Sequence, residues 1–330
     1  MTALAPHLTA FLRQHLPLER RASPATLDTY AHALRLLVCY AAERLGTRPS
    51  GLEVEALDAP LVLDFLHHLE AGRGNSPRTR NARLAAVNSL FRYLEYRLPS
   101  CLDQARCIRA IPVKRTDERL VRHLTREEVQ ALLDAPDPRT IPGARDRAML
   151  HVAFAGGLRV SELVGLRLDD LRLAPEPVLH VLGKGRRERL LPLWRETATA
   201  LRAWLAVRRG EHDPALFLNA RGEAMTRAGF EYILSEHAKA AARTCPSLAT
   251  RRVSPHVLRH SCAMHMLHAT RDIRRVSLWL GHAGLRTTEV YLRADPTEKL
   301  ETLTAAAAPS LRRGHFRPPD ELIALLSERP

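Results

Sequence analysis

Four residues in the last third of the chain have types and spacing that suit attack on a phosphodiester. His256 and Arg259 lie three positions apart, which is about one turn of a helix. His282 follows in a Leu-Gly-His turn, and Tyr291 stands nine residues later. A guanidinium stabilises charge on the phosphate oxygens, imidazoles carry protons, and a phenol can act as the nucleophile. These side chains together would suit a protein hydroxyl that attacks phosphorus.

Two upstream positions extend this set. Arg159 stands in G-G-L-R-V-S-E-L, three residues before Glu162 on a predicted helix. Lys184 lies between two glycines at the tip of a predicted hairpin, where it could donate a proton to a departing oxygen. Taken alone, each residue also has a plain structural interpretation. Arg159 could form a surface ion pair, Lys184 could face solvent in a turn, and Tyr291 could pack at the edge of a core.

A histidine-rich stretch near the same motif raises the alternative of a metal site. It comprises His256, His260, Cys262, His265 and His268, within 13 residues. However, no H-E-x-x-H pattern occurs, and no acidic residue lies between Arg251 and Arg271. The chain also lacks a phosphate-binding G-x-x-x-x-G-K-[ST] loop and a G-x-S-x-G elbow. We therefore expect no metal, no cofactor and no use of ATP.

The elements that precede these motifs are predicted to be helical. Ser23-Pro24 and Ser76-Pro77 each place a serine as N-cap before a proline at the first helical position. Apolar residues then recur at spacings of three and four, as on one face of a helix. Residues 4–16 and 57–69 give two more such segments. Four helices with short connections predict a small bundle.

The helix that begins at Pro77 carries a second, polar face near its N-terminal end. Basic side chains beside free backbone N–H groups can bind phosphate, although a solvated polar face is the alternative. The stretch 99–122 is rich in basic residues and contains Pro112, and is expected to be an extended linker. The candidate DNA-binding residues of these two segments are Arg78, Thr79, Arg80, Arg83, Lys114 and Arg115.

A second domain is predicted to begin near Leu124. Thr125 and Glu128 form a capping-box pattern at the start of a helix. The segments V-L-H-V-L and R-E-R-L-L-P-L read as two strands around a tight turn, and helical patterns follow. The expected fold class is mainly α (α+β): an N-terminal helical bundle and a mainly helical domain with a small antiparallel sheet.

The charge of the chain favours a polyanionic partner. Its 50 basic and 36 acidic residues give a net charge of +14. Nucleic acid is the commonest partner of such a protein. The sequence has no apolar run of the roughly 20 residues that span a membrane and no secretory signal at its start. The five scattered cysteines form no C-x-x-C pair. We expect a cytoplasmic, nucleoid-associated protein without a membrane partner.

In this order, the motifs resemble those of the tyrosine recombinase (phage integrase) family, especially its Xer-like members. The matching segments are A-G-G-L-R-V-S-E-L-V-G-L, V-L-G-K-G-R-R-E-R-L-L-P-L, H-V-L-R-H-S and L-G-H-A-G-L-R-T-T-E-V-Y. The resemblance implies that Tyr291 attacks DNA and forms a 3′-phosphotyrosine. It implies that Lys184 protonates the departing 5′-oxygen and that His256 assists proton transfer. The remaining implied site residues are Arg159, Arg259 and His282, which stabilise the phosphorane, and Glu162, which supports the site.

The resemblance also implies a division of the chain. Residues 1–110 would form a SAM-like core-binding domain that clamps double-stranded DNA, and residues 111–123 a linker. Residues 124–305 would form the catalytic domain. Residues 306–330 would form a C-terminal tail whose helix docks on a neighbouring protomer or on its own domain. Four protomers on two duplexes would exchange strands.

Two other functions remain open at this point. A type IB topoisomerase uses the same chemistry but relaxes supercoils without a paired target site. A non-catalytic DNA-binding protein could keep the fold, although it would have no need of Tyr291 or Lys184. The sequence leaves open the target site and the role in dimer resolution, phage integration or transposition.

Overall fold

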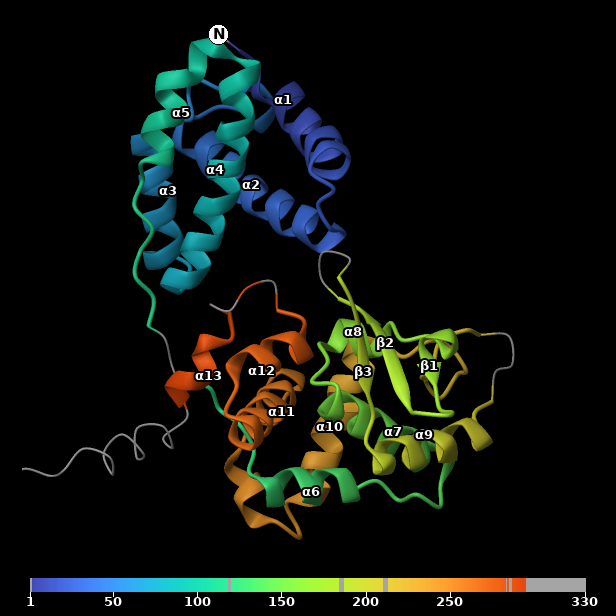
Figure 1. Ribbon diagram of the computed structural model, residues 1–330. Helices are drawn as coiled ribbons and strands as arrows, with labels where there is room; N and C mark the ends of the chain where they lie inside the picture. Colours follow the sequence, from blue (N-terminus) through green and yellow to red (C-terminus); the bar gives the residue numbers. More distant parts are fainter. Residues whose placement is uncertain are drawn as a thin grey trace, which may run out of the picture. The chain divides into compact units, whose positions relative to one another are not determined.

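The computed structural model describes residues 2–117, 120–183, 187–209, 213–282, 284 and 287–294. The chain divides into two compact units, residues 1–118 and residues 119–330. Each unit has its own core of buried apolar side chains. The helices and strands of both units are labelled in Figure 1. In the described part of the chain, no helix has the length and apolar character that crossing a bilayer requires.

The first unit is helical, as its sequence predicts. Ser23 and Ser76 cap α2 and α4, where each hydroxyl accepts a hydrogen bond of 3.3 Å from the backbone N–H three residues later. The four helices expected from the apolar spacing are present. In chain order the elements are α1 (Leu4–Ala10), the π-helical η1 (Phe11–Glu19), α2 (Pro24–Arg44), η2 (Pro49–Gly51), α3 (Ala59–Ala71), α4 (Pro77–Arg97), η3 (Pro99–Cys101) and α5 (Leu102–Arg109).

The helix α5 corrects the expectation that residues 99–122 are extended throughout. Cys101, Ala105 and Ile108 are buried and pack into the core of the first unit. The basic composition of the stretch obscured this short apolar face. The chain beyond α5 is then held on α4, because Asn81 exchanges two hydrogen bonds with the backbone of Lys114, of 2.8 and 3.0 Å.

The second unit is mainly helical with a small sheet. Thr125 and Glu128 form the expected capping box at the start of α6. In chain order the elements are α6 (Arg126–Asp134), α7 (Ile141–Ala155), α8 (Val160–Val164), η4 (Leu168–Asp170), β1 (Leu171–Arg172), β2 (Val178–Leu182), β3 (Glu188–Pro192), α9 (Arg195–Val207), α10 (Arg227–Ala241), η5 (Pro246–Thr250), α11 (Pro255–Thr270), α12 (Ile273–Leu280) and α13 (Glu289–Ala294).

The sheet is antiparallel in the order β1-β2-β3, which confirms the predicted hairpin and adds a short third strand. Leu179 and Val181 of β2 and Leu191 of β3 point into the core. The alternate positions along each strand are more exposed, as on a sheet that covers a core with one face.

Helix α7 runs through the centre of the second unit and is buried along most of its length. Helix α11 packs against it. Gly157, just after α7, has a φ of +52°, and an added Cβ there would lie 2.6 Å from Leu280 and 3.1 Å from Sγ of Cys262. The turn after α7 therefore requires a glycine, both for its backbone angle and for its close contact with α11 and α12.

Candidate active site

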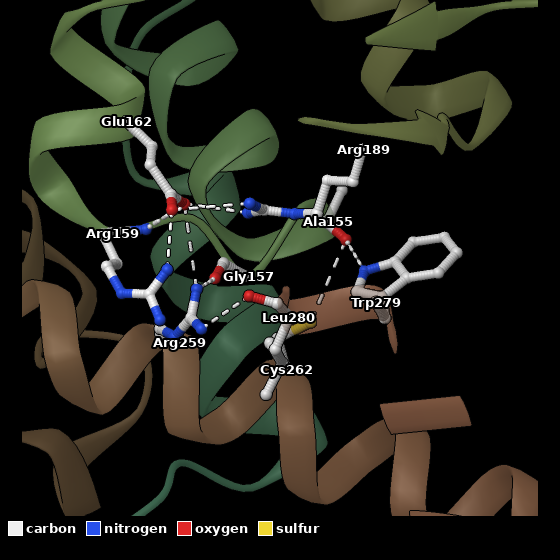
Figure 2. Close-up of polar contacts among 9 residues, drawn as sticks. All are labelled: Ala155, Gly157, Arg159, Glu162, Arg189, Arg259, Cys262, Trp279 and Leu280. Carbon is white, nitrogen blue, oxygen red and sulfur yellow. Dashed lines mark hydrogen bonds and ion pairs between the residues drawn. The ribbon is translucent and has the colours of Figure 1, made fainter. Parts of the chain in front are cut away.

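A buried carboxylate, that of Glu162, organises the site. Glu162 lies on α8, and its side chain is 3% exposed. It accepts a hydrogen bond of 2.7 Å from Nη1 of Arg159 and one of 3.0 Å from the Arg159 backbone N–H. Nη2 of Arg189 lies 2.8 Å from the same carboxylate, and Nη1 of Arg259 lies 3.8 Å away (Figure 2). Three guanidinium groups thus surround one carboxylate.

The charge of Glu162 is held in place by these neighbours. Burial by itself would raise the pKa of the Glu162 carboxyl, but the hydrogen bonds from Arg189 and Arg159 lower it overall. The carboxylate is therefore ionised at neutral pH. Three positive charges against one negative charge leave two positive charges in excess at this point. Such an excess suits a phosphate group whose negative charge grows during reaction.

Arg259 is the most deeply buried of the three arginines, with 4% of the residue exposed. It donates to the backbone carbonyl of Gly157 and, at 2.8 Å, to that of Leu280 (Figure 2). Burial, and then the charge of Arg159, lower the pKa of Arg259 to about 10, so it remains charged at neutral pH. The two carbonyls fix the guanidinium between the turn after α7 and the end of α12.

Tyr291 on α13 is 1% exposed, and its hydroxyl lies 2.9 Å from Nδ1 of His260. Burial raises the pKa of Tyr291 to about 12, although the charges of Arg259 and Arg159 act to lower it. Burial also lowers the pKa of His260 to about 4. At neutral pH the phenol is therefore protonated and the imidazole is neutral. In the tautomer with its proton on Nε2, the imidazole accepts the hydrogen bond of the phenol at Nδ1.

His282 lies beside the same phenol. Its ring is nearly parallel to that of Tyr291, at 7° and with 6.4 Å between the ring centroids. Nδ1 of His282 is 2.7 Å from Oγ1 of the buried Thr288, which fixes the orientation of the ring. Burial, and then the charges of Arg259 and Arg159, lower the pKa of His282 to about 4. This imidazole is also neutral at neutral pH.

The structure brings together most of the site residues expected from the sequence. Five of them converge on one place from α8 and the residue before it, from α11, from the turn after α12 and from α13. They are Arg159, Glu162, Arg259, His282 and Tyr291. The ring of His256 is exposed and lies 6.3 Å from that of His260, between ring centroids. Lys184 lies outside the described residues, as do the C-terminal positions 306–330.

The candidate DNA-binding residues of the first unit differ in how exposed they are to solvent. Arg78 is exposed on α4, whereas Arg80 is 2% exposed and donates at 2.7 Å to the carbonyl of Pro112. Arg80 therefore holds the chain after α5 against α4 and is not available to a phosphate. Thr79 and Arg83 are partly exposed, and Lys114 forms an ion pair of 2.8 Å with Glu70. Arg115 is exposed.

Three further residues of the site were not identified from the sequence. Arg189 contacts Glu162, His260 contacts the phenol, and Thr288 contacts His282. From the sequence, His260 is a candidate only for metal binding. A signal was present for one of them, since His260 lies one helical turn after His256 and so shares its face of α11. Among the described residues, no group of three histidine, cysteine or acidic side chains is placed to hold a metal ion.

Comparison with known proteins shows the family of the chain. Residues 122–298 match the sequence model of the phage integrase family, and residues 8–97 match that of the phage integrase N-terminal SAM-like domain. The chain is 43% identical over 325 residues to "Putative integrase/recombinase y4rC" of Sinorhizobium fredii, with 98% of each chain covered. It is 37% identical over 294 residues to the tyrosine recombinase XerC of Pelotomaculum thermopropionicum, which covers 86% of this chain and 92% of that protein.

Solved structures share the fold. The XerH site-specific recombinase in its post-cleavage complex with palindromic difH substrate superposes with a TM-score of 0.66 at 24% identity, over 86% of this chain and 81% of that one. The Tn1549 transposon integrase in complex with transposon right end DNA gives a TM-score of 0.67 at 17% identity, over 92% and 100% of the two chains.

The fold and site define a DNA strand-breaking and rejoining enzyme of the tyrosine recombinase class. The chain belongs to the phage integrase family.

Proposed function

We propose that this enzyme exchanges DNA strands through Tyr291 with a defined role for each residue of the site. The phenol oxygen forms a bond to phosphorus, and the bond from phosphorus to the 5′-oxygen breaks. The phenol gives its proton to His260. His256, the more exposed of the two histidines, assists this proton transfer. Lys184 supplies a proton to the 5′-oxygen, and Arg159, Arg259 and His282 stabilise the pentacovalent phosphate.

The observation that carries this proposal is that two arginines and a histidine surround the phenol of Tyr291. The charges of Arg259 and Arg159 both act on Tyr291, and His282 stacks beside it. The pentacovalent phosphate of a transesterification carries two negative charges on its non-bridging oxygens. The two positive charges in excess around Glu162 match that charge.

The reaction balances without a further reactant. One phosphodiester becomes a phosphotyrosine ester and a free 5′-hydroxyl, and attack by a second 5′-hydroxyl reverses the step. Because one ester replaces another, the bond energy is conserved and no nucleotide cofactor is required. The cofactor-free and metal-free chemistry expected from the sequence is part of this proposal.

We propose double-stranded DNA as the substrate and a tetramer on two duplexes as the working assembly. A lambda integrase tetramer bound to a Holliday junction has a related fold, with a TM-score of 0.61 at 15% identity. In the first unit, the residues proposed to contact phosphates are Arg78, Thr79, Arg83, Lys114 and Arg115. A cytoplasmic, nucleoid-associated location follows from this substrate.

We propose a separate role for each segment of the chain. Residues 1–110 clamp the duplex, 111–123 link the two domains, and 124–305 carry the reaction. The tail 306–330, proposed to dock on a protomer, lies outside the described residues.

Covalent capture tests the proposal. The full chain is incubated with fragmented genomic DNA of its source, denatured in detergent, and recovered with any DNA still attached. The wild-type chain should retain fragments that share one site, whereas Tyr291→Phe should retain none and still bind the same DNA in a gel-shift assay. Adducts that persist in Tyr291→Phe, or an absence of adducts with the wild-type chain, would refute the proposal.

Relaxation of supercoiled DNA distinguishes the topoisomerase alternative. A plasmid that lacks the captured site should stay supercoiled in the presence of the enzyme. Rapid relaxation of that plasmid would instead favour a type IB topoisomerase.

A further inference from the structure

Arg189 adds to the positive charge around Glu162, but the proton transfers and phosphate contacts proposed above give it no role of its own. It lies on β3, and its side chain is 9% exposed. Nη2 donates to Oε2 of Glu162 at 2.8 Å, and Nη1 approaches Oε1 at 3.4 Å (Figure 2). Arg189 therefore contacts both carboxylate oxygens, whereas the side chain of Arg159 contacts only one.

Two glycines make room for the Arg189 side chain. A Cβ added at Gly281 would lie 3.0 Å from Nη1 and 3.2 Å from Cδ of Arg189, and one added at Gly183 would lie 3.2 Å from Nη1. Gly281 also has a φ of +63°, which disfavours any other residue. Because Gly281 directly precedes His282, the Arg189 side chain lies close to the turn that carries this histidine.

The buried position of Arg189 is energetically unfavourable by itself. Its Nε is buried and has no hydrogen-bond partner among the described residues. An apolar side chain could fill the same space without leaving a polar atom unsatisfied. The feature that only an arginine provides here is the two-point contact with the Glu162 carboxylate.

This contact limits the number of hydrogen bonds that the Glu162 carboxylate can accept from the other two arginines. With both of its oxygens engaged by Arg189, Glu162 holds a single side-chain nitrogen of Arg159, and Arg259 stays 3.8 Å away. A guanidinium has five N–H donors. Arg159, whose side chain is 29% exposed, thus retains donors that can face a phosphate.

We propose that Arg189 is a positioning residue for strand cleavage, which fixes the Glu162 carboxylate and thereby orients Arg159 and Arg259 toward the scissile phosphate. It acts through Glu162 and does not touch DNA. The inference rests on the proposed function, since it assumes that Arg159 and Arg259 bind the reacting phosphate.

The test measures cleavage in a single turnover on a nicked duplex that carries the captured site. Arg189→Met removes the charge and both hydrogen bonds, and Arg189→Lys keeps the charge but loses the two-point contact. Because misplaced catalytic groups cost about a hundredfold in rate, we expect about that loss for Arg189→Met and a smaller loss for Arg189→Lys. DNA affinity should stay within about threefold of wild type, because Arg189 contacts no phosphate in this proposal.

A double-mutant cycle separates positioning from mere structural support. Glu162→Gln alone should slow cleavage, and Arg189→Met in that background should add little, because the residue acts through Glu162. A matched control is Arg172→Met, which removes one arginine from the exposed side of β1 in the same sheet and should cleave like wild type. Thermal melting establishes that each variant is folded, and Arg189→Lys carries the cycle if Arg189→Met does not fold.

The outcomes are distinguishable. Wild-type cleavage rates in Arg189→Met, or losses that multiply in the double variant, would overturn the role of Arg189 while leaving the proposed function intact. Failure of the wild-type chain to form the Tyr291 adduct would instead remove the proposed function itself.

Discussion

The phenol oxygen of Tyr291 lies 2.9 Å from Nδ1 of His260, which stands four residues after His256 on α11. The two pKa values, about 12 for the phenol and about 4 for the imidazole, keep the proton on the tyrosine. In this arrangement the nucleophile is covered and protonated. A bound phosphate would bring negative charge to the site, which raises the pKa of a nearby imidazole and makes it a better acceptor.

Replacement of His260 tests this contact. His260→Ala removes the group nearest the phenol proton, so single-turnover cleavage should fall by about a hundredfold, within the range for loss of a general base. DNA binding should not change. The comparison variant is His256→Ala. Loss of cleavage in His256→Ala with full cleavage in His260→Ala would show that the proton reaches His256 directly and that His260 only packs against the ring.

The contact between His282 and Thr288 gives a second prediction. Thr288→Val keeps the shape of the side chain but leaves Nδ1 of His282 without its partner at 2.7 Å. The imidazole then loses its fixed orientation, and we expect cleavage to slow by about tenfold or more. Thr288→Ser, which keeps the hydroxyl, should restore most of the rate. Equal rates for the valine and serine variants would argue against an orienting role.

Two arginines on α4 make a matched pair for DNA binding. Arg78 is exposed, so Arg78→Ala should reduce the slope of log affinity against log salt by about 1, as expected for one lost phosphate contact. Arg80 is buried on the carbonyl of Pro112, so Arg80→Ala should destabilise the first unit by about 2 kcal/mol. Salt titrations and thermal melting of both variants check this, and a salt effect of Arg80→Ala without loss of stability would contradict it.

The buried His151 is expected to make the stability of the folded chain sensitive to acid. It is buried on α7, and its Nε2 has no hydrogen-bond partner among the described residues. Burial, and then the charge of Arg147, lower the pKa of His151 from 6.5 to about 4. The unfolded chain therefore binds a proton more readily than the folded chain between these values. The stabilising contribution of the neutral ring is complete above about pH 6.5 and is lost as the pH falls toward 4.

Urea unfolding at pH 7 and pH 5 measures this effect. His151→Leu should reduce the loss of stability between the two pH values by about 2 kcal/mol, since the substituted side chain takes up no proton in either state. All three tryptophans, Trp194, Trp204 and Trp279, lie in the second unit, so their fluorescence reports the unit that contains His151. An unchanged pH dependence in His151→Leu would assign the acid sensitivity to other groups.

Most of the local structure and the chemical class could be predicted from the amino-acid sequence alone, although the helix α5 could not. Ser23, Ser76 and Thr125 start helices because a side-chain oxygen reaches an N–H only three residues away, and such a contact needs no distant part of the chain. The residue types and spacing of His256, Arg259 and Tyr291 fit phosphodiester chemistry, but each also has a plain structural interpretation. The resemblance of the ordered motifs to the tyrosine recombinase family indicated the class of enzyme.

Which of these side chains meet depends on how the helices pack in three dimensions. His256 and His260 lie on the same side of α11, and the position of α13 selects His260 as the neighbour of Tyr291. Likewise, nothing in the local sequence distinguishes Arg80, which was predicted to bind DNA, or Arg189 from the rest of the 46 arginines. Their burial depends on where Pro112 and Glu162 lie, and such contacts between distant segments follow from packing and not from local spacing.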